Sequence, residues 1–268
     1  DRVFPVFDFE FRFQRPQQIA AHLAGSGHRV FWVSPSRPYA GGSAAESIDV
    51  VPLRERVFEV RYRGPHFRIY TDTLPPAQAE EIVGALAELY RSHLLGQAMI
   101  LVQFPFWRQV ALELKQRFGG VVVYDCMDDW RNWTAEPRIS RFALDEERKL
   151  AVECDVLSAT SAALSKRWEA EAGRPVLRLR NGADFDFFRA AESVGLLDGI
   201  PRPIVGYYGA VADWVDTELL AELAAARPNY SFVIIGEVHG EDISRLKALP
   251  NVHLLGEKHY RQIPLSLI

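Results

Sequence analysis

Cysteine is scarce in this 268-residue chain, which contains only Cys126 and Cys154. Nothing in the spacing of these two residues suggests a disulfide framework, so we expect the protein to work in a reducing compartment. The seven histidines are scattered along the sequence, and none of them has the spacing of a metal ligand. The sequence therefore predicts a protein without a metal site.

Long apolar runs and runs of basic residues are also missing. No stretch approaches the roughly 20 apolar residues that span a bilayer, and no signal peptide opens the chain. The 31 basic and 35 acidic side chains give a formal net charge of −4 without a basic stripe, which argues against a nucleic-acid partner. With 48% hydrophobic and 25% charged residues, the composition is typical of a globular protein with one large or two modest cores.

The sequence instead alternates apolar, strand-like runs with amphipathic, helix-like runs. It opens as a strand, a helix that begins near Pro16 and a second strand. Such an alternation indicates an α/β fold with a parallel sheet covered on both faces. Later strands are expected at 99–104, 121–125, 155–160 and 175–180, and helices at 76–94, 106–118, 139–153 and 162–172. Residues 37–75 are the least readable, with short strands expected at 48–52 and 56–62.

A second α/β unit is expected near the end of the chain. We predict that residues 1–188 form a complete N-terminal Rossmann-like domain and that 189–202, rich in Gly and Pro, form a linker. Residues 203–268 then begin a second Rossmann-like domain and stop in the middle of it. Because few helices are available to cover its strands, we expect this part to pack on a partner, either a missing C-terminal segment or a second copy.

Acidic and aromatic residues follow the strand at 121–125. Three carboxylates and two indoles beyond a strand end are costly to place in an apolar setting, so they are expected to face a cleft. Sugars suit this mixture, because carboxylates accept hydroxyl hydrogens and rings cover C–H faces. A divalent metal would find no further ligands nearby, and the structural alternative is a capped loop anchored by its tryptophans. These residues are Asp125, Asp128, Asp129, Trp130 and Trp133.

The turn after the first strand contains Arg12, Gln14 and Arg15, before the Pro16 helix. Ligands of open α/β sheets bind beyond the carboxyl ends of the strands, which makes this turn a candidate site. The alternative is a solvated turn that caps the helix. We expect the turn and the acidic cluster to share one edge of the first sheet, facing the second domain.

Two glycine-containing turns are further candidates. Asn181-Gly182 favours positive φ and is expected to end a strand sharply. Gly209, after the strand that begins the second domain, allows a ligand to approach the backbone closely. The spacing around Gly209 is not G-x-G-x-x-G, so a dinucleotide fingerprint is absent.

Glu146 and Glu147 interrupt the apolar stripe of the helix at 139–153. Carboxylates at a buried helix face usually pair with a cation. We therefore interpret them as structural, in salt bridges to Arg141, Arg148 or a more distant arginine.

In their order along the chain, these segments resemble the retaining glycosyltransferases of the GT-B fold, in particular family 4 (glycosyl transferases group 1). The combination spans nearly the whole chain and is more specific than any single piece. The segments are QRPQQIAAHLAGSGHRVFWVSP, VVVYDCMDDW, ERKLAVECDVLSATSAALSKRW, RNGADFDFF and PIVGYYGAVADWVDTELLAELAAARPNYSFVIIGE with LPNVHLLGEKHY.

The resemblance implies two facing Rossmann-like domains, with a glycan, glycolipid or polysaccharide acceptor on the first and a nucleotide sugar on the second. It implies transfer with retention of configuration, assisted by the leaving diphosphate, and no cofactor or metal. The expected location is cytoplasmic, with peripheral association of the parent protein at the inner face of the membrane.

The resemblance also suggests roles for individual residues. The expected catalytic residues are Asp125, Asp128 and Asp129. The expected acceptor-binding residues are Arg12, Gln14, Arg15 and Trp130. The expected donor-binding residues are Asn181, Gly182, Asp184, Gly209, Asp213, Trp214 and Gly236.

The chain departs from the family pattern in three ways. The segment GAVADWVD lacks the arginine and lysine that clamp the donor diphosphate, and Asp125-Cys126-Met127-Asp128 stands where the family often has a histidine. The pair of glutamates that holds the donor lies beyond Ile268, so we expect a C-terminally truncated chain that is inactive alone. The alternative is a non-catalytic GT-B-like binding or scaffolding module of a larger glycan-assembly protein.

Overall fold

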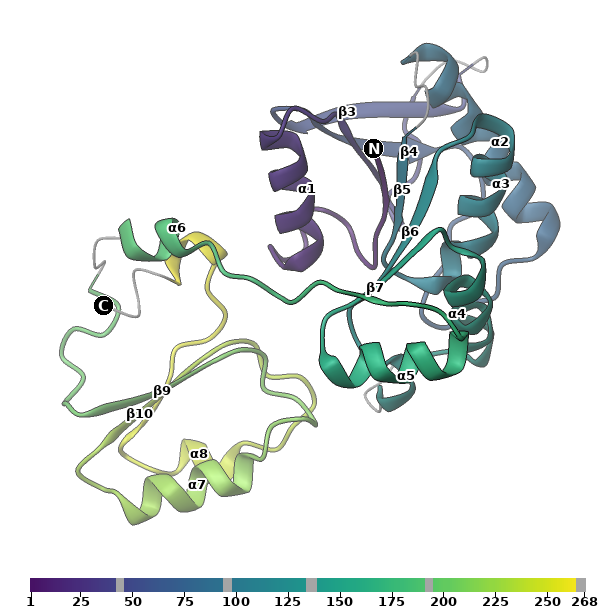
Figure 1. Ribbon diagram of the computed structural model, residues 1–268. Coiled ribbons are helices and arrows are strands. Elements are labelled where there is room, and N and C mark those ends of the chain that lie inside the picture. The colour runs from purple at the N-terminus through teal and green to yellow at the C-terminus, as the bar shows by residue number, and fades with distance from the viewer. Residues whose placement is uncertain (42–45, 94–97, 134–138, 191–194, 264–268) are drawn as a thin grey trace. The chain divides into compact units, whose positions relative to one another are not determined.

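The computed structural model describes residues 1–41, 46–93, 98–133, 139–190 and 195–263. The chain divides into two compact units, Asp1–Gly182 and Ala183–Ile268. Each unit combines a mainly parallel sheet with helices (Figure 1), which confirms the predicted α/β class.

The sheet of the first unit has eight strands in the order β3-β4-β2-β1-β5-β6-β7-β8. Neighbouring strands are parallel except for β3 and β4, which form an antiparallel hairpin at one edge. The strand predicted at 175–180 is shorter than expected. The strands are β1 (Arg2–Phe4), β2 (Val30–Val33), β3 (Ile48–Arg54), β4 (Val57–Tyr62), β5 (Met99–Val102), β6 (Val121–Cys126), β7 (Val156–Ala159) and β8 (Leu177–Arg178).

Helices lie on both faces of this sheet and bury two cores. Because successive strand residues point to opposite faces, Val3 packs with Ala20 of α1 on one side, whereas Phe4 joins the core on the side of α2, α3 and α4. The predicted cap Ser161 accepts a hydrogen bond from the Leu164 amide at 3.2 Å. The helices are α1 (Arg15–Gly25), α2 (Pro76–Ser92), η1 (Pro105–Trp107), α3 (Arg108–Phe118), η2 (Trp130–Asn132), α4 (Arg141–Glu153) and α5 (Ala162–Ala172).

The second unit contains a three-stranded parallel sheet in the order β11-β10-β9. Every residue of the central strand β10 is buried, whereas Val205 and Tyr208 on the edge strand β9 are exposed. The elements are α6 (Phe185–Ala190), β9 (Ile204–Tyr208), α7 (Thr217–Ala226), β10 (Ser231–Ile235), α8 (Ser244–Lys247), β11 (Val252–Leu254) and η3 (Tyr260–Gln262).

Both faces of β10 are covered within the second unit itself. On one face Ile234 packs with Ala221 of α7 and Leu246 of α8. On the other face Val233 and Ile235 pack with apolar side chains from α6 and from the stretch that was expected to be a linker, namely Phe188, Leu196, Leu197 and Ile200. The expectation that only the helices near 216–227 and 242–248 are available to cover these strands is therefore wrong. The Gly and Pro content of 195–202 pointed to a linker, although this stretch also carries apolar side chains that pack on the sheet.

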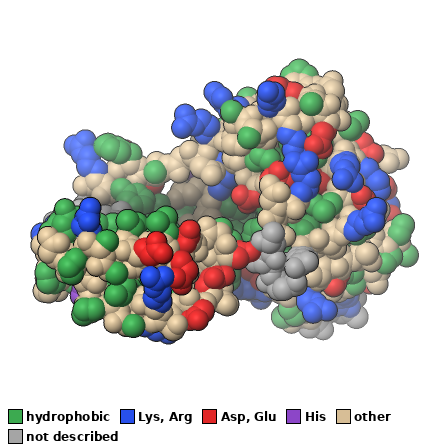
Figure 2. Space-filling model, turned by 90° about the horizontal axis from the view of Figure 1, so that it is seen from below, with side chains coloured by type: hydrophobic (Ala, Val, Ile, Leu, Met, Phe, Trp, Pro, Cys, Tyr) green, Lys and Arg blue, Asp and Glu red, His purple; other side chains and the backbone are tan. Residues whose placement is uncertain are grey.

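The outer surface of α7 and α8 mixes hydrophobic, acidic and basic side chains (Figure 2). Arg245 forms an ion pair with Glu218 and lies 4.0 Å from Glu222, and Leu219 and Leu223 of α7 are exposed. Interspersed charges of both signs are ordinary for a solvated helix face.

Gly236 is predicted to be the glycine least tolerant of substitution in the second unit. An added Cβ would lie 1.8 Å from the carbonyl oxygen of Gly209, far inside van der Waals contact. We expect Gly236→Ala to lower the free energy of unfolding by about 2–3 kcal/mol, measured by denaturant unfolding. Gly206→Ala is the matched control, because a Cβ there meets nothing within 4 Å. Equal stability of the two variants would contradict the prediction.

Candidate functional site at the carboxyl edge of the first sheet

Arg15, the first residue of α1 directly after the β1 turn, meets Asp125 of β6 at the carboxyl edge of the first sheet. Arg15 donates from Nε to Oδ2 of Asp125 at 3.0 Å and from Nη2 to Oδ1 at 2.8 Å. This bidentate pair confirms that the turn and the acidic cluster share one edge of the sheet.

Asp125 and Arg15 are occupied by protein groups. Asp125 is 1% exposed and also accepts a hydrogen bond from Ser158 Oγ at 2.9 Å. Arg15 uses its remaining nitrogen, Nη1, to donate to Asn181 Oδ1 at 3.1 Å and to the Arg180 carbonyl at 3.2 Å. Three residues predicted to have catalytic, acceptor-binding and donor-binding roles thus bind one another, so this cluster ties β6 to the end of the first unit.

Asp129 is held by two arginines. It accepts hydrogen bonds from Arg131 at 2.8 and 2.9 Å and from Arg167 at 2.9 Å, and its carboxylate also caps η2 by accepting from the Arg131 amide. Because the Arg131 bonds favour the ionised form, the pKa of Asp129 is lowered. This geometry matches the structural alternative of a capped loop.

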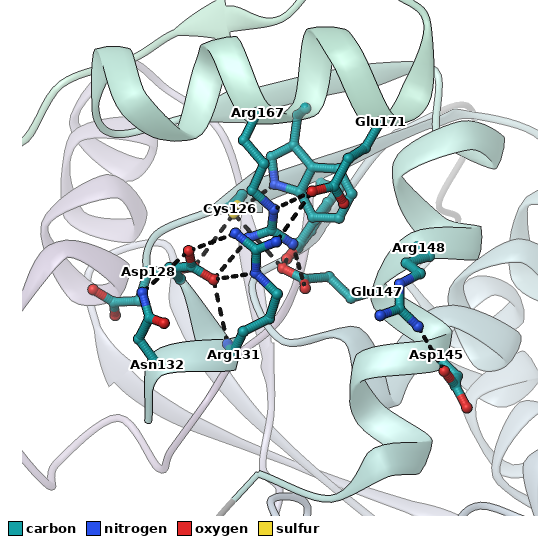
Figure 3. Close-up of polar contacts among 12 residues, drawn as sticks. Cys126, Asp128, Arg131, Asn132, Asp145, Glu147, Arg148, Arg167 and Glu171 are labelled. Atoms are coloured by element: carbon teal, nitrogen blue, oxygen red, sulfur yellow. Dashed lines mark hydrogen bonds and ion pairs between the residues drawn. The ribbon is translucent and has the colours of Figure 1, made fainter. Parts of the chain in front are cut away.

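Glu147 of α4 continues this network into the core (Figure 3). Its carboxylate accepts from Tyr124 Oη at 2.8 Å and from Arg167 Nη2 at 3.2 Å, and burial raises its pKa although both bonds favour the charged form. Glu146 pairs with Arg108 at 2.6 Å. The interpretation of Glu146 and Glu147 as structural is confirmed, because both form ion pairs with arginines distant in sequence. Arg148, one of the expected partners, pairs with Asp145 instead.

Trp130 does not face a cleft. It is 2% exposed, and its ring packs edge-on against Phe104 with centroids 5.1 Å apart. The ring is therefore part of the core and cannot cover the apolar face of a ligand in this structure. The expectation of an acceptor-binding Trp130 mistook an anchor of the loop for a binding surface.

Asp128 is the one carboxylate of the predicted trio without a hydrogen bond or ion pair to its side chain among the described residues. Asp128 is exposed, yet desolvation by the surrounding protein raises its pKa, and the charge of Arg15 only partly opposes this. A carboxylate with free acceptor positions at the edge of the sheet is available to a ligand hydroxyl.

The sequence analysis missed Tyr70, which lies in the weakly patterned region 37–75. Burial raises the pKa of its phenol, and the charge of Asp128 adds to the shift. Its ring lies parallel to that of Trp133, with centroids 6.2 Å apart and an interplanar angle of 15°. No periodicity marks this residue, so only the folded chain brings it to Asp128.

The sequence analysis also missed Asp8 in the β1 turn, where it accepts hydrogen bonds from Ser36 and, at 2.5 Å, from Ser34. The rule that favoured Arg12 and Gln14 would have found it, because Asp8 follows the same strand. In the same turn, the Arg12 guanidinium lies 5.0 Å from the centroid of Phe11, and Gln14 presents an exposed side chain.

The predicted turn at Asn181-Gly182 differs from expectation. Gly182 has no positive φ, and a Cβ there would meet nothing within 4 Å, so the position does not require glycine. Asp184, in the second unit, accepts a hydrogen bond from the Phe187 amide at 3.1 Å and so caps α6.

The glycines of the second unit pack on each other at the ends of β9 and β10. The Gly209 amide donates to the Ile235 carbonyl at 2.9 Å, and Gly236 allows the Gly209 carbonyl to approach. Asp213 and Trp214 are exposed in the following loop, Trp214 at 59%. A metal-binding cluster of three or more His, Cys, Asp or Glu side chains is not found in the described residues. Within the same residues no helix is long and apolar enough to cross a membrane.

No protein-family model matches the chain. It is 26% identical over 159 residues to a Bacillus subtilis (strain 168) protein named as a teichuronic acid biosynthesis glycosyltransferase, TuaH. The match covers 53% of this chain and 40% of the relative, so the chain spans less than half of that protein's length.

Solved structures resemble the chain along nearly its whole length. Sucrose-phosphate synthase from Thermosynechococcus elongatus has a TM-score of 0.68 and 13% identity, and the match covers 99% of this chain and 72% of that one. HepE from Anabaena, solved with UDP and glucose, has a TM-score of 0.60 and 15% identity over 99% of this chain and 71% of that one. An α,α-trehalose-phosphate synthase from Burkholderia vietnamiensis has a TM-score of 0.59 and 12% identity over 99% and 72%. The chain therefore has the GT-B fold, as its resemblance to family 4 predicts.

Proposed function

We propose that the protein is a glycosyltransferase that moves a sugar from a nucleotide-sugar donor to a hydroxyl of a glycan, glycolipid or polysaccharide acceptor, with retention of configuration. Two likenesses support this function: the sequence match to TuaH, which is named for teichuronic acid biosynthesis, and the fold match to HepE, which was solved with UDP and glucose.

The observation that carries the proposal is that two of the three aspartates form ion pairs with arginines, whereas Asp128 forms none among the described residues. Asp125 is neutralised by Arg15 and Asp129 by Arg131 and Arg167, so neither carboxylate has to serve a ligand. Asp128 remains exposed at the same edge of the sheet. In this proposal Asp128 accepts a hydrogen bond from the acceptor hydroxyl and orients its oxygen.

In the proposed reaction the acceptor oxygen forms a bond to the anomeric carbon of the donor sugar. The bond between that carbon and the diphosphate oxygen breaks, and its electron pair stays on the leaving nucleoside diphosphate. The hydroxyl proton passes to the same diphosphate, so no metal, oxidant or further reactant is needed. The protein mainly holds the reacting atoms close together, which is a large part of catalysis in such transfers.

The proposed donor site lies in the second unit, beyond the carboxyl ends of β9 and β10. Gly209 and Gly236 end these strands, and the loop with Asp213 and Trp214 leads into α7. Ligands of open α/β sheets bind at such strand ends. We also propose that Asp184 of the second unit contributes to donor binding, and that the protein works at the inner face of the membrane on a lipid-linked acceptor.

A second candidate is a GT-B-like module that binds glycans or nucleotides without turnover. The segment from Gly209 to Asp216 contains no arginine or lysine, so the loop after β9 offers no cationic side chain to a diphosphate. This observation favours weak donor binding, which is what a non-catalytic module would show.

The test uses the full-length protein and a panel of UDP, ADP and GDP with their glucose, N-acetylglucosamine and mannose derivatives. We expect at least one nucleotide to raise the unfolding temperature, and its sugar conjugate to release nucleoside diphosphate when bacterial glycan and lipid-linked acceptors are added. The anomeric configuration of the product, read by NMR, tests retention. Binding without release would favour the non-catalytic module. Absence of binding to every nucleotide and nucleotide sugar would refute the glycosyltransferase and the nucleotide-binding form of the module.

A further inference from the structure

We propose that Arg167 is a positioning residue, which clamps the loop after β6 so that Asp128 keeps its place at the carboxyl edge. This proposal rests on the glycosyltransferase function for its kinetic consequence, but the clamp itself is a property of the chain. Arg167 belongs to α5, is remote in sequence from the loop and was not among the residues expected from the sequence.

Arg167 contacts three carboxylates with its three guanidinium nitrogens (Figure 3). Nη1 lies 2.9 Å from Asp129 Oδ1, Nη2 lies 3.2 Å from Glu147 Oε2, and Nε lies 3.1 Å from Glu171 Oε1. Its side chain is 10% exposed, and its guanidinium carbon stacks 4.1 Å from the Trp168 ring centroid. A planar guanidinium with all nitrogens engaged and one face stacked is fixed in orientation.

Glu147, the buried partner of Arg167, is itself held in place by the core. Glu147 is 1% exposed and receives Tyr124 Oη from β6, the strand that leads into the loop. Trp168 Nε1, next to Arg167 on α5, donates to Cys126 Sγ at 3.2 Å at the end of the same strand. Two adjacent residues of α5 thus hold both sides of Asp128. Trp168 binds Cys126 at the strand end, and Arg167 binds Asp129, the residue directly after Asp128.

The position of Asp128 follows from its neighbours on either side. Cys126 precedes it by two residues and contacts its carbonyl, with Sγ 3.5 Å from the Asp128 oxygen. Asp129 follows it directly and is gripped by Arg167 and Arg131. With both flanks anchored, the Asp128 backbone has little freedom, although its own carboxylate makes no ion pair among the described residues.

The experiment compares Arg167→Ala, Arg167→Lys and Arg148→Ala in the full-length protein. Arg148 is the matched control, because it forms an exposed ion pair with Asp145 at 2.9 Å in the same region but does not contact the loop. Hydrogen exchange is followed at the amides of Arg131 and Asn132, which donate to Asp129. We expect exchange of these amides to become about tenfold faster in Arg167→Ala, to be intermediate in Arg167→Lys and to be unchanged in Arg148→Ala.

The kinetic readout is the KM for the acceptor, measured with the donor and acceptor mixture that the wild type uses. We expect Arg167→Ala to raise it severalfold with the donor KM unchanged, and Arg167→Lys to restore part of the loss. A lower unfolding temperature with wild-type exchange at both amides and a wild-type acceptor KM would overturn the proposal, because Arg167 would then only stabilise the fold. If the wild type binds no nucleotide sugar, the glycosyltransferase function fails, whereas the exchange data still decide whether Arg167 holds the loop.

Discussion

Replacing Asp128 by asparagine is expected to lower kcat/KM for the acceptor about 100-fold without lowering the stability of the protein. The substitution keeps the size of the side chain and removes the charge that would orient an acceptor hydroxyl. Desolvation raises the pKa of Asp128, so folding makes its ionisation less favourable than it is in the unfolded chain, and a neutral amide at this position should not lower stability. Transfer rates and thermal unfolding of the full-length protein measure the two effects.

The pH dependence of transfer gives an independent check of the same residue. If ionised Asp128 orients the acceptor, wild-type transfer falls as the pH drops through a pKa above that of an ordinary aspartate. The Asp128→Asn variant should lack this limb of the profile. Asp145→Asn is the control, because Asp145 forms an exposed pair with Arg148 away from the site. Equal turnover in Asp128→Asn and the wild type would remove Asp128 from the site.

The sequence predicted much of the first unit because its signals are local. Apolar runs such as 121–125 and caps such as Ser161 act within a few residues, and the corresponding strand and helix lie where expected. The shared sheet edge was also predictable, since parallel strands place their carboxyl ends together. The Arg15–Asp125 pair lies at that edge and joins two residues that are 110 positions apart in the sequence.

The roles of individual carboxylates could not be predicted, because they depend on partners distant in sequence. Asp125, Asp128 and Asp129 look equivalent along the chain. In the folded chain, however, Asp125 forms an ion pair with Arg15, and Asp129 forms one with Arg167. The burial of Trp130 against Phe104 likewise depends on two strand ends meeting. The cover of the second sheet was missed for another reason: the apolar stretch around Leu196 has no helical or strand period.

Removal of the Arg15 side chain should produce a large loss of stability in the first unit. Asp125 is 1% exposed, and in Arg15→Ala its carboxylate would keep the hydrogen bond from Ser158 but lose its cation. Breaking a buried ion pair in this way costs about 3–5 kcal/mol. Denaturant unfolding of the full-length protein measures the loss. Arg180→Ala is the matched control, because Arg180 contacts Arg15 only through its main-chain carbonyl and its own side chain is exposed.

A double variant separates the buried charge from lost packing. If the penalty in Arg15→Ala comes from Asp125, then adding Asp125→Asn removes the charge and should recover about half of the lost stability. Lost packing of the arginine stem would instead leave the double variant no more stable than Arg15→Ala. Arg15 also holds Asn181, the second-last residue of the first unit, through the 3.1 Å bond from Nη1. Arg15→Ala should therefore speed proteolytic cleavage near Asn181 relative to Arg180→Ala, and equal cleavage rates would show that this bond does not restrain the chain where it leaves the first unit.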